Sequence, residues 1–212
     1  MKVLSVNVGR PRDVPWRGKV YRTSIWKDRV AGPRNVRTLN IDGDEQSDLS
    51  VHGGRHKAVY AYPSEHYDAW RRELGAELQW GVFGENLTTE GIFETDIRIG
   101  DRLRIGSAEF QVTQPRMPCF KLGIRFDRDD MVRRFLESGR PGLYLAVIRE
   151  GTLTAGDDVM LDGSSEHDVT IADVAEAYAT GGADHNLLER VVAVPTLPDG
   201  LKRHFAKLLG RA

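Results

Sequence analysis

The sequence of 212 residues contains a single cysteine, Cys119, and no apolar run of the length that a membrane helix needs. One cysteine excludes a disulfide within the chain and any cluster site held by several cysteines. The N-terminal stretch MKVLSVNVGRPRD has neither an apolar core nor a small-residue cleavage site, so no signal peptide is predicted. We therefore expect a cytoplasmic protein that does not associate with membranes.

The net charge is also close to zero, because the chain has 30 Lys and Arg residues and 31 Asp and Glu residues. This balance disfavours a protein that binds a long nucleic acid. Positive charge is nevertheless concentrated between Arg10 and Arg37, where nine basic residues are opposed only by Asp13 and Asp28. Such a segment suits a small anionic ligand, and Arg34 and Arg37 would help to hold it if they face a pocket. A solvated strand surface would explain the same residues.

Apolar and polar residues alternate along most of the chain up to about residue 163, which indicates short strands with one buried face. Two helices are predicted among them, one after Pro63 and one after Asp129, because apolar residues recur there at helical spacing. We therefore predict a mainly β fold with added helices, in which an antiparallel sheet forms a barrel or a sandwich. The expected strands cover residues 4–8, 20–26, 36–41, 58–62, 97–105, 108–112 and 143–148.

The pattern changes to helical periodicity after Gly163. Thr170 with Asp173 resembles a capping pair, and two more short helices are expected after Asp184 and Asp199. We predict two domains, 1–163 and 164–212, the second a three-helix appendage that packs on the sheet domain or on a second subunit in a homodimer. A helix-turn-helix module that binds nucleic acid is disfavoured, because residues 164–212 carry five basic against seven acidic side chains.

The stretch QPRMPCFKL, from Gln114 to Leu122, is the first candidate for chemistry. Prolines on both sides of Arg116 and Met117 stiffen a loop that leaves the sheet just after a strand. Arg116 and Lys121 lie close to Cys119 in sequence and favour its thiolate, which is a ligand for soft metals. A small buried cysteine without chemistry is the alternative interpretation.

Two further polar stretches could bind a ligand. In the first, Gly53 and Gly54 allow backbone amides to approach an anion, while His52 and the basic residues that follow supply donors. A tight turn before the next strand is the structural alternative. In the second, VFGENLTTEG, Asn86 and Thr88 offer neutral donors and acceptors that suit an amide-rich heterocycle, or simply a polar loop.

Together these stretches resemble the MOSC family, named for the C-terminal domain of molybdenum cofactor sulfurases, and most closely its YiiM-like branch. The resemblance is carried by four segments in consistent order between about residues 40 and 124. The three-helix tail also fits that branch. The four segments are DGDEQSDLSVHGG from Asp42, AVYAYPSEHYDAW from Ala58, VFGENLTTEG from Val82 and IGDRLRIGSAEFQVTQPRMPCFKL from Ile99.

The resemblance implies a MOSC-type antiparallel β-barrel that binds the molybdenum cofactor, a pterin dithiolene carrying a phosphate. In the family, the cysteine at the position of Cys119 supplies a thiolate to molybdenum, which makes Cys119 the expected metal ligand and catalytic residue. Asn86 and Arg116 occupy positions of the cofactor pocket. The matching motifs add a further set of expected cofactor-binding residues, namely His52, Gly53, Gly54 and Thr88.

The resemblance also implies an oxidoreductase. Proteins of the YiiM-like branch are similar to enzymes that reduce small N-hydroxylated compounds, including hydroxylaminopurine base analogues, to amines, and so detoxify them. One cysteine cannot hold an iron–sulfur cluster and no flavin-binding signature is present, so electrons should come from a separate electron-donor protein. The alternative is a sulfur carrier that uses a Cys119 persulfide in metal–sulfur cluster or cofactor assembly. Molybdenum content separates the two functions.

Overall fold

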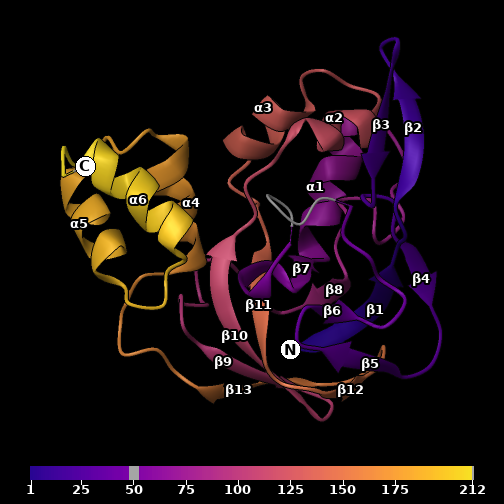
Figure 1. The fold of residues 1–212 in the computed structure, drawn as a ribbon, viewed down its shortest axis with the longest axis horizontal. Helices are drawn as coiled ribbons and strands as arrows, with labels where there is room; N and C mark the ends of the chain where they lie inside the picture. The colour runs from indigo at the N-terminus through magenta and orange to yellow at the C-terminus, as the bar shows by residue number, and fades with distance from the viewer. Residues whose placement is uncertain (48–52, 212) are drawn as a thin grey trace.

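The computed structural model describes residues 1–47 and 53–211, and it confirms a mainly β fold with added helices (Figure 1). The helices are α1 (Glu65–Leu74), α2 (Phe120–Phe126), α3 (Met131–Glu137), α4 (Ile171–Ala179), α5 (His185–Ala193) and α6 (Asp199–Leu208), with a 3-10 turn, η1 (Arg55–Lys57). The strands are β1 (Lys2–Val8), β2 (Arg12–Trp16), β3 (Lys19–Thr23), β4 (Asp28–Val30), β5 (Arg34–Arg37), β6 (Asn40–Ile41), β7 (Val59–Pro63), β8 (Leu87–Glu90), β9 (Arg102–Ile105), β10 (Ala108–Pro115), β11 (Leu143–Arg149), β12 (Gly151–Leu153) and β13 (Val159–Gly163).

The main sheet has eight strands in the order β13-β9-β10-β11-β7-β8-β1-β4. It differs from the expected barrel because the strand ladder is not continuous around a ring. A single bridge between Lys2 and Asp158, with a hydrogen bond from the Val3 N–H to the Asp157 carbonyl at 2.9 Å, joins β1 to the segment before β13. The β-rich class is therefore confirmed, while closure rests on a few bonds at one point.

One pair in this sheet is parallel, β7 with β8, and all its other strand pairs are antiparallel. A parallel pair needs a crossover connection, and the chain between Pro63 and Leu87 provides it with α1. Tyr67 and Trp70 of α1 are buried in an aromatic cluster with Phe83 and Phe135. This crossover brings the VFGENL segment to the sheet next to β1.

The three helices of the tail pack on the sheet of the same chain. Thr170 and Asp173 form the expected capping box at the start of α4, and the Ile171 N–H donates to the Ile97 carbonyl at 2.9 Å. Apolar residues of α4, α5 and α6 belong to the same buried cluster as those of the sheet, and Phe205 of α6 is fully buried. The tail and the sheet therefore share one hydrophobic core.

Several local expectations differ from the structure. Residues 36–41 form a hairpin of β5 and β6 rather than one strand, and residues 97–101 precede β9 as a short segment with an isolated bridge from Arg98 to Thr170 and a turn. The short helix α2, which begins directly after Cys119, is not anticipated by the sequence pattern. No helix within residues 1–47 and 53–211 is long and apolar enough to cross a membrane.

Candidate functional site

A recess beside Cys119 gathers residues from six separate parts of the chain. Counted to its open mouth, and so including the solvent there, its volume is about 640 Å³. Polar and cationic side chains predominate among the residues around it. The lining consists of Thr23, Ser24, Ile25, Lys27, Asp44, Gln46, Ser47, Lys57, Tyr60, Gly84, Asn86, Arg116, Met117, Cys119, Lys121 and Tyr144.

Cys119 lies at the wall of this recess, between the end of β10 at Pro115 and the start of α2. It has an extended backbone, with φ −128° and ψ 171°, and its carbonyl accepts a hydrogen bond from the Leu122 N–H at 2.9 Å. The side chain is half-buried rather than enclosed in the core. This placement agrees with the expected stiff loop and leaves the thiol within reach of a ligand in the recess.

Four cationic side chains line the same recess, and they come from segments that are distant in sequence. Lys121 is buried and its Nζ donates to Ser47 Oγ at 3.2 Å. Burial lowers the pKa of Lys57, while the neighbouring Cys119 acts in the opposite direction. The other two cations are Arg116 and Lys27. Among the lining residues that the structure describes, Asp44 is the one carboxylate that opposes them, so this part of the recess favours an anionic ligand.

Arg116 is the most deeply buried of these cations, with an exposed fraction of 6%. Its guanidinium carbon lies 5.1 Å from the centre of the Tyr60 ring and 5.2 Å from that of Phe135, so the charge is held between two aromatic faces. Its Nη1 is buried and has no hydrogen-bond partner among residues 1–47 and 53–211. An unpaired buried donor costs about 1–3 kcal/mol, and a bound acceptor would remove that cost.

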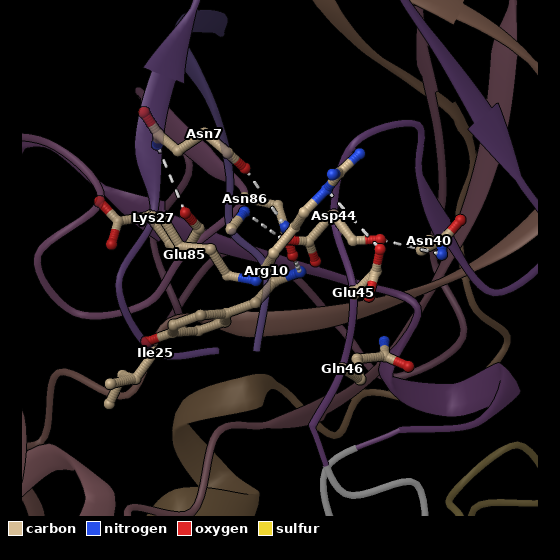
Figure 2. A network of polar contacts seen from close by, with 12 residues as sticks. Asn7, Arg10, Ile25, Lys27, Asn40, Asp44, Glu45, Gln46, Glu85 and Asn86 are labelled. Atoms are coloured by element: carbon tan, nitrogen blue, oxygen red, sulfur yellow. Dashed lines mark hydrogen bonds and ion pairs between the residues drawn. The ribbon is translucent and has the colours of Figure 1, made fainter. Parts of the chain in front are cut away.

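Lys27 is neutralised by a buried ion pair with Asp44, whose side chain is 2% exposed (Figure 2). Asp44 also accepts a hydrogen bond from the Gly9 N–H at 2.8 Å, and Asn40 donates to the Asp44 carbonyl at 3.1 Å. These bonds fix the segment after β6 against the end of β1. The pair therefore forms a rigid polar wall of the recess.

Asn86 lines the recess, but its side chain is also bonded to the backbone of neighbouring strands (Figure 2). The Tyr60 N–H donates to Asn86 Oδ1 at 3.1 Å, and Asn86 Nδ2 donates to the Asn7 carbonyl at 3.3 Å. Each of these Asn86 groups keeps one further bonding position. Asn86 thus connects β1 to β7, and any contact with a ligand would be additional.

Thr88 does not line the recess, although the sequence places it among the cofactor-binding residues. It is fully buried, donates to Glu85 Oε1 at 3.0 Å and accepts from Asn7 Nδ2 at 3.2 Å. Glu85 also accepts hydrogen bonds from the Tyr67 hydroxyl and, at 2.7 Å, from the Gly81 N–H. Burial raises the pKa of Glu85. The contacts of Thr88 are those of a buried structural network beneath the recess.

The Gly53-Gly54 pair forms the turn that leads into η1. Gly54 has φ +89°, a left-handed conformation that favours glycine, and its carbonyl accepts from the Lys57 N–H at 3.0 Å. Neither glycine lines the recess; the turn instead positions Lys57, which does. The predicted ligand His52 lies outside the described residues.

The basic segment contributes less than its composition suggests. Lys27 is its one cationic residue in the lining of the recess, and all of residues 10–37 are described. Arg37 pairs with Asp42 at 3.1 Å on the surface, and Arg34 lines a separate shallow hollow. Neither Arg34 nor Arg37 lines the recess, so the structure favours the alternative of a solvated strand surface for these two residues. The sequence indicates Lys57 as a donor for an anion but not its place beside Cys119, and it contains no sign that Tyr60 belongs to the same recess, because nothing local shows that either residue reaches Cys119.

Comparison with known proteins places the chain in a family. Residues 48–160 match the family described as MOSC domain, and residues 169–211 match the one described as YiiM-like, 3-alpha helix domain. Protein YiiM of Escherichia coli (strain K12) is 38% identical over 156 residues, covering 72% of this chain and 69% of that protein.

Two further similarities extend over nearly the whole chain. The crystal structure of YiiM from Geobacillus stearothermophilus superposes with a TM-score of 0.83 at 30% identity, covering 98% of both chains. A protein of Gibberella moniliformis (strain M3125 / FGSC 7600) named "Reductase" is 30% identical over 91% of this chain, which spans 35% of that longer protein. With the domain matches, these similarities show that the chain belongs to the MOSC domain family, in the branch that carries the YiiM-like three-helix domain.

Proposed function

We propose that this protein is a molybdenum-cofactor-dependent oxidoreductase that reduces small N-hydroxylated compounds to amines. The observation that carries the proposal is the half-buried Cys119 in a recess lined by four cationic side chains. Membership of the MOSC domain family and the reductase name of one relative support it. The electrons would come from a separate electron-donor protein, since the chain has one cysteine.

The residues of the recess suit the chemistry of the cofactor. Its phosphate is an anion, and Lys57, Lys121 and the positive charge of the buried Arg116 suit it. The thiol of Cys119 is a soft ligand of the kind that molybdenum accepts. In this proposal the pterin dithiolene holds the metal, and Cys119 adds one protein ligand to it.

Reduction of an N–OH group consumes two electrons and two protons, breaks the N–O bond and releases water. When bound, the cofactor would supply the redox centre for this change, which no side chain provides. The protein would contribute binding and orientation: Cys119 would anchor the metal, the cations would hold the phosphate, and the buried pair of Lys27 and Asp44 would keep the wall of the recess rigid.

The test is Cys119→Ser, which keeps the shape and replaces the thiol by a harder ligand. We expect the melting temperature to change little, because the half-buried side chain leaves the hydroxyl near water, while turnover of an N-hydroxylated purine collapses. Arg149→Ala, an exposed change on β11, is the control and should keep wild-type turnover. Wild-type turnover per folded molecule in the serine variant would contradict the proposal.

The same preparations test the sulfur-carrier alternative. Mass spectrometry of protein expressed with molybdate should find molybdenum near stoichiometry in the wild type and less in the serine variant. Wild-type protein without molybdenum, but with a labile sulfur atom on Cys119, would instead favour the carrier.

A further inference from the structure

A second recess lies on the other side of the loop that carries Cys119. It is bounded by residues 116–118, by α3 and the segment after it, and by α4 of the tail, and its volume to the open mouth is about 860 Å³. Most of its lining is apolar. The side chains that matter here are Met117, Pro118, Phe135, Leu136, Ala172 and Ala175.

The two recesses share Arg116 and Met117 in their linings. The Arg116 guanidinium lies between Tyr60, which lines the first recess, and Phe135, which lines the second, at 5.1 and 5.2 Å from the ring centres. The exposed fraction of Arg116 is 6%, and its Nη1 has no hydrogen-bond partner in the part of the chain that the structure describes. A hydrogen-bond donor is therefore held at the boundary between the two spaces.

The tail shapes the second recess through the small side chains of α4. Ala172, Ala175 and Ala179 follow one another at intervals of three and four residues, so they lie on one face of the helix, and all three line the recess. Larger apolar residues of α4, such as Val174, point into the common core instead. The result is a slot between α4 and the wall formed by Pro118 and Phe135.

We propose that this second recess binds the ring of a planar N-hydroxylated heteroaromatic substrate and directs its N–OH group past Met117 towards Cys119. The inference rests on the proposed function and deepens it. Apolar walls of proline, methionine, phenylalanine and alanine suit a flat ring, and the Arg116 guanidinium suits a ring nitrogen or carbonyl acceptor at the inner end. The tail is then one wall of the substrate site rather than a separate appendage.

A binding experiment on the cofactor-free chain tests this placement directly. The sequence has four methionines, so protein labelled with [¹³C-methyl]methionine gives a simple spectrum, in which Met117→Leu identifies the Met117 signal. With N6-hydroxyladenine as the probe, we expect the Met117 methyl to shift in the wild type but not in Ala175→Phe, because Met117 lines both recesses and Ala175 lines the second alone, while the methyl of Met160, exposed on β13, shifts in neither. An unchanged Met117 signal at saturating probe would overturn the proposal, whatever else the recess binds.

A kinetic experiment then separates this inference from the proposed function. Ala175→Phe fills the slot and should raise the KM for N6-hydroxyladenine at least about tenfold, about 1.4 kcal/mol of binding, while turnover of hydroxylamine, which has no ring, stays at the wild-type level. Ala206→Phe, at a half-buried alanine of α6 outside the recess, is the matched control.

The outcomes of this second experiment differ for the two ideas. Wild-type holoprotein that reduces neither compound would refute the proposed function. Wild-type protein that reduces both, together with an unchanged KM in Ala175→Phe, would refute only the assignment of the second recess. A KM raised equally by Ala206→Phe would also refute it, because the effect would then be a general one on the tail.

Discussion

Asn86 should stabilise the fold as well as face the recess, and Asn86→Ala tests this. The substitution removes the acceptor of the Tyr60 N–H and the donor to the Asn7 carbonyl, both in a buried part of the sheet. Each backbone group left without its partner costs about 1–3 kcal/mol, so the free energy of unfolding should fall by about 2–6 kcal/mol. The loss would be a large part of the stability of an ordinary domain.

Equilibrium unfolding in urea, with linear extrapolation, measures this change. Asn35→Ala is the control. The Asn35 side chain donates a hydrogen bond to Asp42 at 2.8 Å, but Asn35 is exposed to solvent. That variant should lie within about 0.5 kcal/mol of the wild type. The reasoning fails if Asn86→Ala keeps wild-type stability and loses only its cofactor, since Asn86 would then act purely as a ligand contact.

Two other variants follow from the same geometry. Because burial raises the pKa of Glu85, the folded chain keeps a proton that the unfolded chain releases, so the stability of the wild type falls as pH rises above the ordinary pKa of glutamate. Glu85→Gln should remove this fall. Urea unfolding between about pH 5 and pH 8 should therefore show the free energy of unfolding of the variant rising relative to that of the wild type. A parallel pH dependence in the two proteins would contradict it. Replacing Arg34 and Arg37 together by alanine should leave molybdenum content unchanged, because neither lines the recess; reduced metal content would show otherwise.

Local features of the fold were predictable from the sequence where they depend on neighbouring residues. The capping box of Thr170 and Asp173 is an example, because both of its hydrogen bonds join residues three apart. The parallel pairing of β7 with β8 was not predictable, since the choice of strand partner depends on the path of the crossover. The helix α2 was missed because the two prolines before Cys119 favour a loop, and the helix begins immediately after them.

The candidate site also combines residues that a local motif identifies with residues that only the fold brings together. Cys119 and Arg116 were identified because unusual residues stand close together in one loop. Lys57 and Tyr60 reach that loop from other segments, so only the folded chain brings them to it. Thr88 shows the converse, since the resemblance includes it in a polar motif, whereas the hydrogen bonds that the structure describes for it are made within the protein.

The common core of sheet and tail limits how the two parts could be recombined with those of relatives. Leu188 and Phe205 of the tail are fully buried in the same cluster as strand residues such as Phe110. A chimera that joins this sheet to the three-helix segment of a relative 30–40% identical would bring together side chains selected against different neighbours. Cavities or clashes of even one methylene group cost about 1 kcal/mol each. Exchange of the helical segment would therefore require matched changes on the sheet, much as a subunit interface does.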